Sequence, residues 1–139
     1  MTSSDQDHTA APPAAAPARA FAKSRNDIGR LVRAMVYSWQ GVRAAWRHEA
    51  AFRLEVMLGL PLLAVAAWAA PGRWHALALG VSVLAVWIVE LLNSAVEALA
   101  DAVSVERHPL IGRAKDMASA AVTFSLLALV LTWGVVFWP

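Results

Sequence analysis

The chain of 139 residues contains no cysteine, which excludes disulfides, zinc ribbons and thiol nucleophiles. Charged residues are also scarce, because Asp, Glu, Lys and Arg make up 16% of the sequence, against roughly 25% in an ordinary soluble domain. Neither a G-x-x-x-x-G-K-[ST] pattern nor a G-x-G-x-x-G loop occurs, so a bound nucleotide would not rest in the usual glycine cradles. The formal net charge of +2 is too small to indicate a nucleic-acid partner.

Apolar residues are abundant instead, at 59% of the chain. With so few charges the chain cannot solvate a globular surface, and its length fits one domain, so the composition indicates a small membrane protein. The first 25 residues differ from the rest: they are rich in Ala, Pro, Ser and Thr, and they have almost no large apolar side chain. The sequence therefore predicts a disordered tail over 1–25 and a membrane domain over 26–139.

The segment of about 27–48 has the periodicity of an amphipathic helix. Its apolar residues recur at spacings of three and four, while its arginines fall largely elsewhere. The apolar positions are Ile28, Leu31, Val32, Met35, Val36, Trp39, Val42 and Trp46. Arginine and tryptophan suit a helix that lies at a membrane surface among anionic headgroups. An ordinary surface helix of a soluble domain remains the alternative for this segment taken alone.

Three apolar segments follow, at about 50–70, 74–101 and 116–138. Each reaches the roughly 20 residues that cross a bilayer, so each is predicted to be a transmembrane helix. A PGR turn separates the first two segments, and the polar stretch DAVSVERHPLIGRAKD separates the last two. Eight of the twelve Lys and Arg residues precede Val56, where the uninterrupted apolar run of the first segment begins, so the N-terminus is predicted to be cytoplasmic and the C-terminus to lie on the outer side.

The stretch IVELLNSAVEALADAV carries four polar residues in an apolar helix. At about 100° per residue, Glu90, Glu97 and Asp101 fall on one stripe, with Asn93 about 60° to its side. This polar seam is expected to straddle the cytoplasmic edge of the hydrocarbon. Ionisable groups at such a depth usually line a functional site, although a hydrogen-bonded packing seam in an oligomer is the alternative.

A second cluster, HEAAFRLE, precedes the first transmembrane segment. Glu49 and Arg53 are four residues apart and are expected to pair on one helix face, although plain interfacial charges are the alternative. Glu49 would lie at the same level as Glu97, and two carboxylates with an asparagine suit a hard cation such as Mg²⁺ with substrate phosphates. Basic residues from the same side that could hold phosphate are Arg30, Arg107, Arg113 and Lys115.

Three motifs in the same order, YSWQGVRAAWRHEAAFRLE, IVELLNSAVEALAD and GRAKDMASAAV, closely resemble those of the prokaryotic integral-membrane diacylglycerol kinase family, from about Arg30 to Trp138. The resemblance implies an all-α membrane protein of the bacterial inner membrane. Each chain would supply one surface helix and three transmembrane helices to a homotrimer with composite active sites. The implied reaction transfers the γ-phosphoryl group of MgATP to the hydroxyl of diacylglycerol, which gives phosphatidic acid.

The resemblance also implies roles for individual residues. Glu90 matches the general base, Glu49 and Glu97 match the ligands of the Mg²⁺, and Asn93 and Asp101 are expected as supporting polar residues. The expected ATP-binding residues are Arg30, Tyr37, Glu49, Glu97, Glu106, His108, Lys115 and Asp116. The expected residues for the acceptor lipid are Arg30, Ala34, Tyr37, Ser38, Trp39, Arg43, Trp46, Ala51, Phe52, Arg53, Glu55, Trp68, Glu90, Ser119, Trp133 and Trp138.

The sequence departs from the family pattern at Leu54, where a polar residue, often Gln, is expected. This departure concerns the lipid side, so an undecaprenol kinase with the same mechanism is the first alternative. A cation-coupled transporter subunit would instead use Glu90 as its carrier site and would not need ATP. A structural subunit would use the polar seam only to set oligomer geometry.

Overall fold

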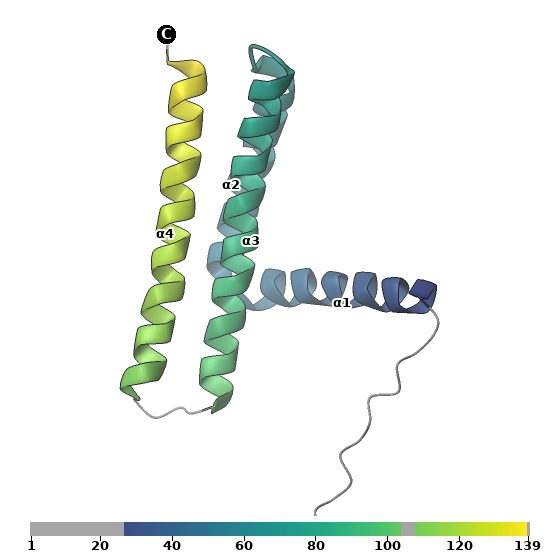
Figure 1. Ribbon diagram of the computed structural model, residues 1–139, viewed down its shortest axis with the longest axis vertical. Helices are drawn as coiled ribbons and strands as arrows, with labels where there is room; N and C mark the ends of the chain where they lie inside the picture. Colours follow the sequence, from purple (N-terminus) through teal and green to yellow (C-terminus); the bar gives the residue numbers. More distant parts are fainter. Residues whose placement is uncertain (1–26, 104–107, 139) are drawn as a thin grey trace, which may run out of the picture.

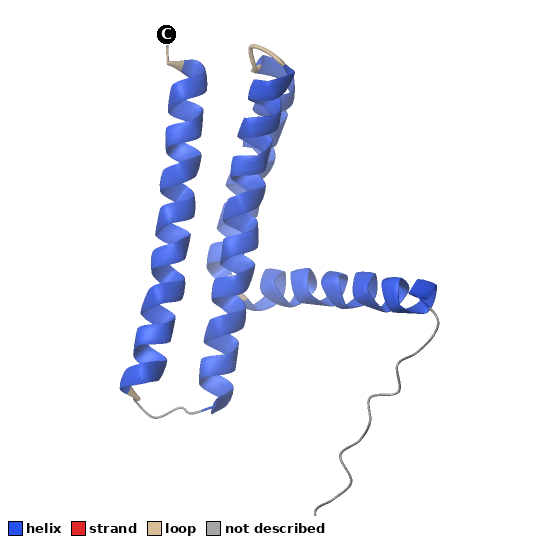
Figure 2. Cartoon of the chain, in the orientation of Figure 1, coloured by secondary structure: helices blue, strands red, loops and turns tan. Residues whose placement is uncertain are grey.

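The computed structural model describes residues 27–103 and 108–138. The described part of the chain forms four helices and no strand (Figures 1 and 2): α1 (Asp27–His48), α2 (Ala50–Ala69), α3 (Arg73–Val103) and α4 (Pro109–Phe137). The predicted all-α fold with one amphipathic helix and three apolar helices is confirmed. The predicted tail over 1–25 lies outside the described residues, as do Glu106 and Arg107.

Helices α2, α3 and α4 run alongside one another, and α3 packs against both of the others. Helix α1 lies crosswise to them and meets the bundle partway along α3, so that one end of α3 and one end of α4 project past it (Figure 1). Most of the apolar face of α1 is exposed, with Ile28, Met35 and Trp39 each more than 60% accessible. This placement suits a helix that rests on a membrane surface beside a transmembrane bundle.

Each of α2, α3 and α4 is long and apolar enough to cross a membrane. Their outward faces carry many exposed large apolar side chains, and no described residue of α4 is fully buried. Such a surface suits lipid or neighbouring helices and does not suit water. The chain is therefore a multi-pass membrane protein, as its composition predicts.

The contact between α2 and α3 depends on a glycine facing a tryptophan. A Cβ atom at Gly59 would lie 2.7 Å from Cζ2 of Trp87 and 2.9 Å from Cγ1 of Val83, so only glycine fits without a shift of these side chains. The Trp87 indole also donates a hydrogen bond from Nε1 to the carbonyl of Glu55, at 3.1 Å. The close approach and the hydrogen bond together fix how α2 sits against α3.

Helix α4 is joined to α3 by a similar contact. Nε1 of Trp133 donates to Oγ of Ser82 at 3.2 Å, and this hydroxyl donates in turn to the carbonyl of Leu79 at 2.7 Å. Leu79 itself is fully buried. An indole with a polar partner inside an apolar contact is the arrangement in which tryptophan can be buried at low cost.

Helix α4 begins at Pro109, seven residues before the predicted start at 116. His108 is its N-cap, and its Nδ1 accepts a hydrogen bond from the backbone N–H of Leu110 at 3.3 Å. Proline suits the first turn because its fixed φ is helical and its missing N–H would have no partner there. The sequence analysis placed His108 and Pro109 in a loop, whereas together they start the helix. The bounds of α2 and α3 lie close to the predicted ones.

Candidate active site

The corner between α1 and α2 consists of a single residue. Glu49 has extended torsions (φ −105°, ψ 114°), while His48 ends α1 and Ala50 begins α2. The guanidinium of Arg53 reaches back across the corner and donates to the carbonyls of Trp46 at 3.1 Å and Arg47 at 3.4 Å. These carbonyls lie in the last turn of α1, where no helical N–H can bond to them. No ion pair joins Arg53 to Glu49 among the described contacts, so the predicted pairing is not formed.

Burial changes steadily along the polar seam of α3. Glu90 is 3% exposed, Asn93 and Glu97 are half-buried, and Asp101 is exposed. This gradient follows from the fold, because beyond the level where α1 meets it α3 has α4 beside it but no longer α2 (Figure 1). The seam therefore runs from an interior carboxylate to one in contact with water.

Four carboxylates gather at this level. Glu97, Glu49 and Glu55 all lie within electrostatic range of Glu90. The side-chain amide of Asn93 donates from Nδ2 to Oε1 of Glu97 at 3.1 Å, which holds one of the carboxylates in place. Like charges so close to one another favour a cation or a proton between them. The sequence analysis predicted that Glu49 would lie level with Glu97, and the fold places each of them within electrostatic range of Glu90.

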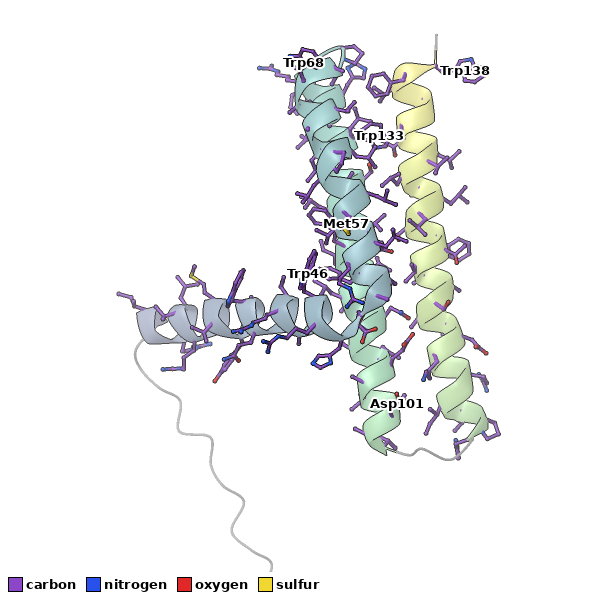
Figure 3. The ribbon with its side chains drawn as sticks, turned by 180° about the vertical axis from the view of Figure 1, so that it is seen from behind. Trp46, Met57, Trp68, Asp101, Trp133 and Trp138 are labelled. Carbon is purple, nitrogen blue, oxygen red and sulfur yellow. The ribbon has the colours of Figure 1, made fainter. Side chains whose placement is uncertain are left out.

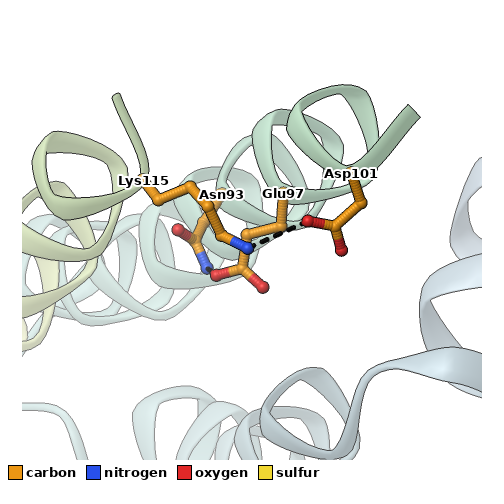
Figure 4. Close-up of polar contacts among 4 residues, drawn as sticks. All are labelled: Asn93, Glu97, Asp101 and Lys115. Carbon is orange, nitrogen blue, oxygen red and sulfur yellow. Dashed lines mark hydrogen bonds and ion pairs between the residues drawn. The ribbon is translucent and has the colours of Figure 1, made fainter. Parts of the chain in front are cut away.

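A lysine from α4 reaches the outer part of the seam (Figure 4). Lys115 Nζ lies 3.1 Å from Oδ1 of Asp101, in an ion pair whose side chains are 38% and 69% exposed. Asp116 is the next residue along α4, so it is rotated by about 100° from Lys115. It is exposed and makes no hydrogen bond or ion pair to a described residue. We call Glu49, Glu90, Asn93, Glu97, Asp101 and Lys115 the polar cluster.

A cavity of about 460 Å³ lies next to the polar cluster, between α1 and α3. Most of its walls are apolar and small, and its polar side chains are Ser38, Glu49 and Ser94. We call it the α1–α3 chamber, and it is lined by Ser38, Gly41, Val42, Ala44, Ala45, Glu49, Leu91, Ser94 and Ala95. An apolar cavity of this size with a few polar groups is typical of a site for a small molecule or a lipid headgroup.

The remaining predicted residues fall into two groups. Those on the second half of α1 or in the first turns of α2 are Ser38, Trp39, Arg43, Trp46, Ala51, Phe52, Arg53 and Glu55, whereas Ser119 lies on α4, which among the described helices packs only against α3. Phe52 is buried, and Glu55 is half-buried with Oε2 unpartnered. His108 caps α4.

Other predicted residues lie far from the polar cluster in this chain. Arg30, Ala34 and Tyr37 line a hollow on the outer half of α1, and Arg30 is roughly 27 Å along the helix from its end at the corner. Trp68, Trp133 and Trp138 lie at the end of the bundle opposite Asp101 (Figure 3). One chain alone therefore does not gather every residue that the resemblance assigns to the site.

Sequence analysis did not single out Ser94, Ser82 or Trp87. Ser94 is buried, lines the α1–α3 chamber and follows Glu90 by one helical turn. Its spacing of four from Glu90 places it on the polar stripe, and this signal could have identified it. Nothing in the sequence pattern of a single helix identifies the partners of Ser82 and Trp87, because these contacts depend on how two helices align.

Comparison with known proteins identifies a family to which this chain is similar. The model of the family described as "Prokaryotic diacylglycerol kinase" matches residues 36–137. A diacylglycerol kinase of Escherichia coli K12 is 44% identical over 118 residues, which cover 85% of this chain and 97% of the relative. A diacylglycerol kinase of Pseudomonas aeruginosa is 46% identical over 115 residues (82% and 93%), and one of Helicobacter pylori 26695 is 41% identical over 107 residues (76% and 82%).

Proposed function

The chain belongs to the prokaryotic diacylglycerol kinase family, and on that premise we propose that its polar cluster transfers the γ-phosphoryl group of MgATP to the hydroxyl of diacylglycerol. The product is phosphatidic acid. The single observation that carries this proposal is the gathering of Glu90, Glu97 and Glu49 where α1 crosses α3, with Glu90 almost completely buried. Phosphoryl transfer depends on positioning and on charge neutralisation, and this arrangement suits both.

Glu90 is the general base in this proposal. The acceptor hydroxyl gives its proton to the Glu90 carboxylate while its oxygen attacks the γ-phosphorus. The bond from that phosphorus to the bridging oxygen breaks, and ADP leaves. Of the three carboxylates Glu90 is the one buried within the bundle, so it is placed to meet a hydroxyl that arrives from the hydrocarbon side. The exposed end of the seam faces water, from which the nucleotide arrives.

Glu49 and Glu97 would hold the Mg²⁺ that arrives with ATP. The donor set fits this ion, since Mg²⁺ is usually bound by one or two carboxylates together with substrate phosphates and waters. Among the described residues, no group of three or more His, Asp or Glu side chains is close enough to hold a metal by itself, and a metal held partly by phosphates does not need one. When bound, Mg²⁺ would neutralise charge on the transferring phosphates. Asn93 keeps Glu97 oriented through its hydrogen bond.

The nucleotide would also contact basic and polar residues. Lys115 stands at the outer end of the seam, where it forms an ion pair with Asp101. Asp116, Glu106 and His108 are proposed to bind the nucleotide as well. Arg30 and Tyr37 lie too far along α1 to reach the same cluster within one chain. This separation supports a homotrimer in which a neighbouring chain completes each site.

The membrane arrangement follows from the same assignments. ATP and Mg²⁺ are cytoplasmic reactants, so the polar cluster and the N-terminal region would face the cytoplasm, and the C-terminus would face the outer side of the bacterial inner membrane. The basic residues before α2 support this orientation. Trp68, Trp133 and Trp138 would then lie toward the outer interface, where tryptophan is enriched.

The test is ATP-dependent phosphate incorporation into dioleoylglycerol in mixed micelles with Mg²⁺, measured for the full chain and for Glu90→Gln. The full chain should label the lipid, and Glu90→Gln should lower kcat by about 100-fold or more, because an amide cannot accept the proton. Circular dichroism and thermal unfolding of both proteins control for folding. A Glu90→Gln protein with full activity would contradict the assignment of the base, and labelling of undecaprenol instead of dioleoylglycerol would contradict the acceptor.

A further inference from the structure

The hydroxyl groups on the described helices follow a common pattern, with one buried exception. Five of them donate a hydrogen bond to a backbone carbonyl three or four residues earlier, which satisfies the hydroxyl within its own helix. They are Ser38, Ser82, Thr123, Ser125 and Thr132. Ser94 and Ser119 make no such bond in the described chain, and of these two only Ser94 is buried.

The Ser94 hydroxyl is thus a buried polar group without a partner. Its residue is 9% exposed, and its Oγ atom has almost no accessible surface. A buried hydroxyl left unsatisfied is unfavourable, and in native proteins such groups usually meet a ligand or an ordered water. Ser94 lines the α1–α3 chamber, so a rotation about its χ1 would bring the hydroxyl within reach of a molecule that occupies the chamber.

Ser94 is also the free donor of this chamber. The chamber's other hydroxyl, that of Ser38, already donates to the carbonyl of Ala34 at 2.9 Å. Glu49, the third polar side chain of the wall, is an acceptor when ionised and cannot donate. A ligand group that needs a side-chain donor in the chamber would therefore turn to Ser94, and a carbonyl oxygen is such a group.

We infer that Ser94 donates a hydrogen bond from Oγ to the ester carbonyl next to the reacting hydroxyl of the acceptor lipid. This inference rests on the proposed function. Ser94 stands one helical turn after Glu90, and residues with this spacing have Cβ atoms roughly 5–6 Å apart on one face. In diacylglycerol the free hydroxyl and the nearest ester stand on adjacent glycerol carbons, so the two groups can face Glu90 and Ser94 at the same time. Ser94 would then favour acceptors that carry an ester over simple alcohols.

The experiment compares two acceptors and three proteins. The acceptors are dioleoylglycerol and the matching ether-linked dioleylglycerol, which has the same hydroxyl and chains but no carbonyl. The proteins are the full wild-type chain, Ser94→Ala and Ser94→Thr, where the threonine keeps the hydroxyl. For each combination kcat and KM are measured for the acceptor, and KM is measured for ATP.

The inference expects wild-type kcat/KM to be roughly 3- to 10-fold higher for the ester than for the ether, which is the range of a single neutral hydrogen bond. Ser94→Ala should lose this preference through a higher KM for the ester, with kinetics on the ether and KM for ATP unchanged. Ser94→Thr should restore much of the preference. A purely structural role for Ser94 would instead lower activity on both acceptors by the same factor, and that result would overturn the inference.

The other outcomes are equally decisive. If wild-type protein treats the ester and the ether alike, the inference is wrong whether or not Ser94→Ala folds, because this comparison needs no variant. Equal preference in wild type and Ser94→Ala would mean that a water or the helix's own carbonyl satisfies the hydroxyl, and it would leave the proposed function intact. A wild-type chain that phosphorylates neither acceptor with ATP would overturn the proposed function itself.

Discussion

Where α2, α3 and α4 run side by side, the indole groups of Trp87 and Trp133 and the hydroxyl of Ser82 are hydrogen-bonded. Helix α2 also approaches α3 so closely at Gly59 that no larger side chain fits there. Trp87 fills the space beside Gly59, and Trp133 is bonded to Ser82. Where α1 crosses α3, by contrast, the Ser94 hydroxyl, the Oδ1 atom of Asn93 and, in the first turns of α2, the Oε2 atom of Glu55 are buried without partners. We call the first region the packed segment, and the second contains the polar cluster.

The two regions differ because the hydrogen bonds of the first stabilise the fold, whereas the incomplete groups of the second are available to bind a ligand. A group whose hydrogen bonds are complete within the chain stabilises the fold, and a ligand would add no hydrogen bond to it. A buried polar group that is left incomplete is tolerated where binding completes it, and such groups gather at functional sites. Substitutions in the polar cluster should therefore change kinetics with little effect on stability, and substitutions in the packed segment should do the reverse.

After Glu90→Gln, the largest expected effect comes from Glu97→Gln in the polar cluster. Loss of one proposed carboxylate ligand should lower kcat/KM by about 100-fold and raise the Mg²⁺ concentration needed for half-maximal activity. A Mg²⁺ titration of the phosphorylation rate measures this, with thermal unfolding as the control for folding. An unchanged Mg²⁺ requirement, with activity close to that of wild type, would remove Glu97 from the metal-binding role.

Gly59→Leu tests the packed segment. The new side chain has no room beside Trp87 and Val83, so it should lower the free energy of unfolding by about 1–3 kcal/mol. Denaturation in mixed micelles followed by circular dichroism measures the change, and kinetics are recorded on the fraction that stays folded. The matched variant Gly41→Leu faces open space, because nothing lies within 4 Å of its added Cβ, but it lines the chamber, so it is compared only for stability. Equal stability of the two variants would mean that α2 and α3 do not pack as described.

Lys115→Gln and Asp101→Asn each remove one partner of the ion pair at the outer end of the polar cluster, so that the role of each residue can be measured separately. If Lys115 contacts nucleotide phosphates, its removal should raise KM for ATP by roughly 10-fold. Asp101 acts only through Lys115, and an exposed ion pair is worth about 0–1 kcal/mol, so Asp101→Asn should change KM for ATP by less than roughly 5-fold. Kinetics with ATP as the varied substrate measure both. A larger effect from Asp101→Asn than from Lys115→Gln would reverse the proposed roles.

The smallest expected effect is the loss of the hydrogen bond between α3 and α4. Trp133→Phe and Ser82→Ala should each cost about 0.6 kcal/mol of unfolding free energy, the typical size of a hydrogen bond between transmembrane helices. The double variant should cost clearly less than the sum of the two, because both remove the same bond. Additive costs measured in the same denaturation assay would show that the bond contributes nothing to stability.

The sequence predicts the helices and the polar seam because each depends on one helix at a time. A periodicity near 3.6 identifies the amphipathic helix, apolar length identifies the three membrane helices, and the helical angle places Glu90 and Glu97 on one stripe. The start of α4 was predicted too late because His108 and Pro109 were placed in the polar loop before it, although proline in a first turn begins a helix.

Contacts between helices cannot be predicted from the sequence pattern of one helix at a time. The facing positions of Gly59 and Trp87, and of Ser82 and Trp133, depend on the depth and rotation at which two helices meet. Arg53 was expected to pair with Glu49 from its spacing alone. The open carbonyls at the end of α1 offered it other partners, and they appear only when α1 stops at His48.

The corner at Glu49 makes one residue both a hinge and a site. Helix α1 continues into α2 through the backbone torsions of this residue alone, so a change in the tilt of α1 must be taken up there or in the helix ends beside it. The same residue carries a carboxylate of the polar cluster. A change in the tilt of α1 on the membrane surface would therefore move the Glu49 carboxylate relative to the rest of the polar cluster.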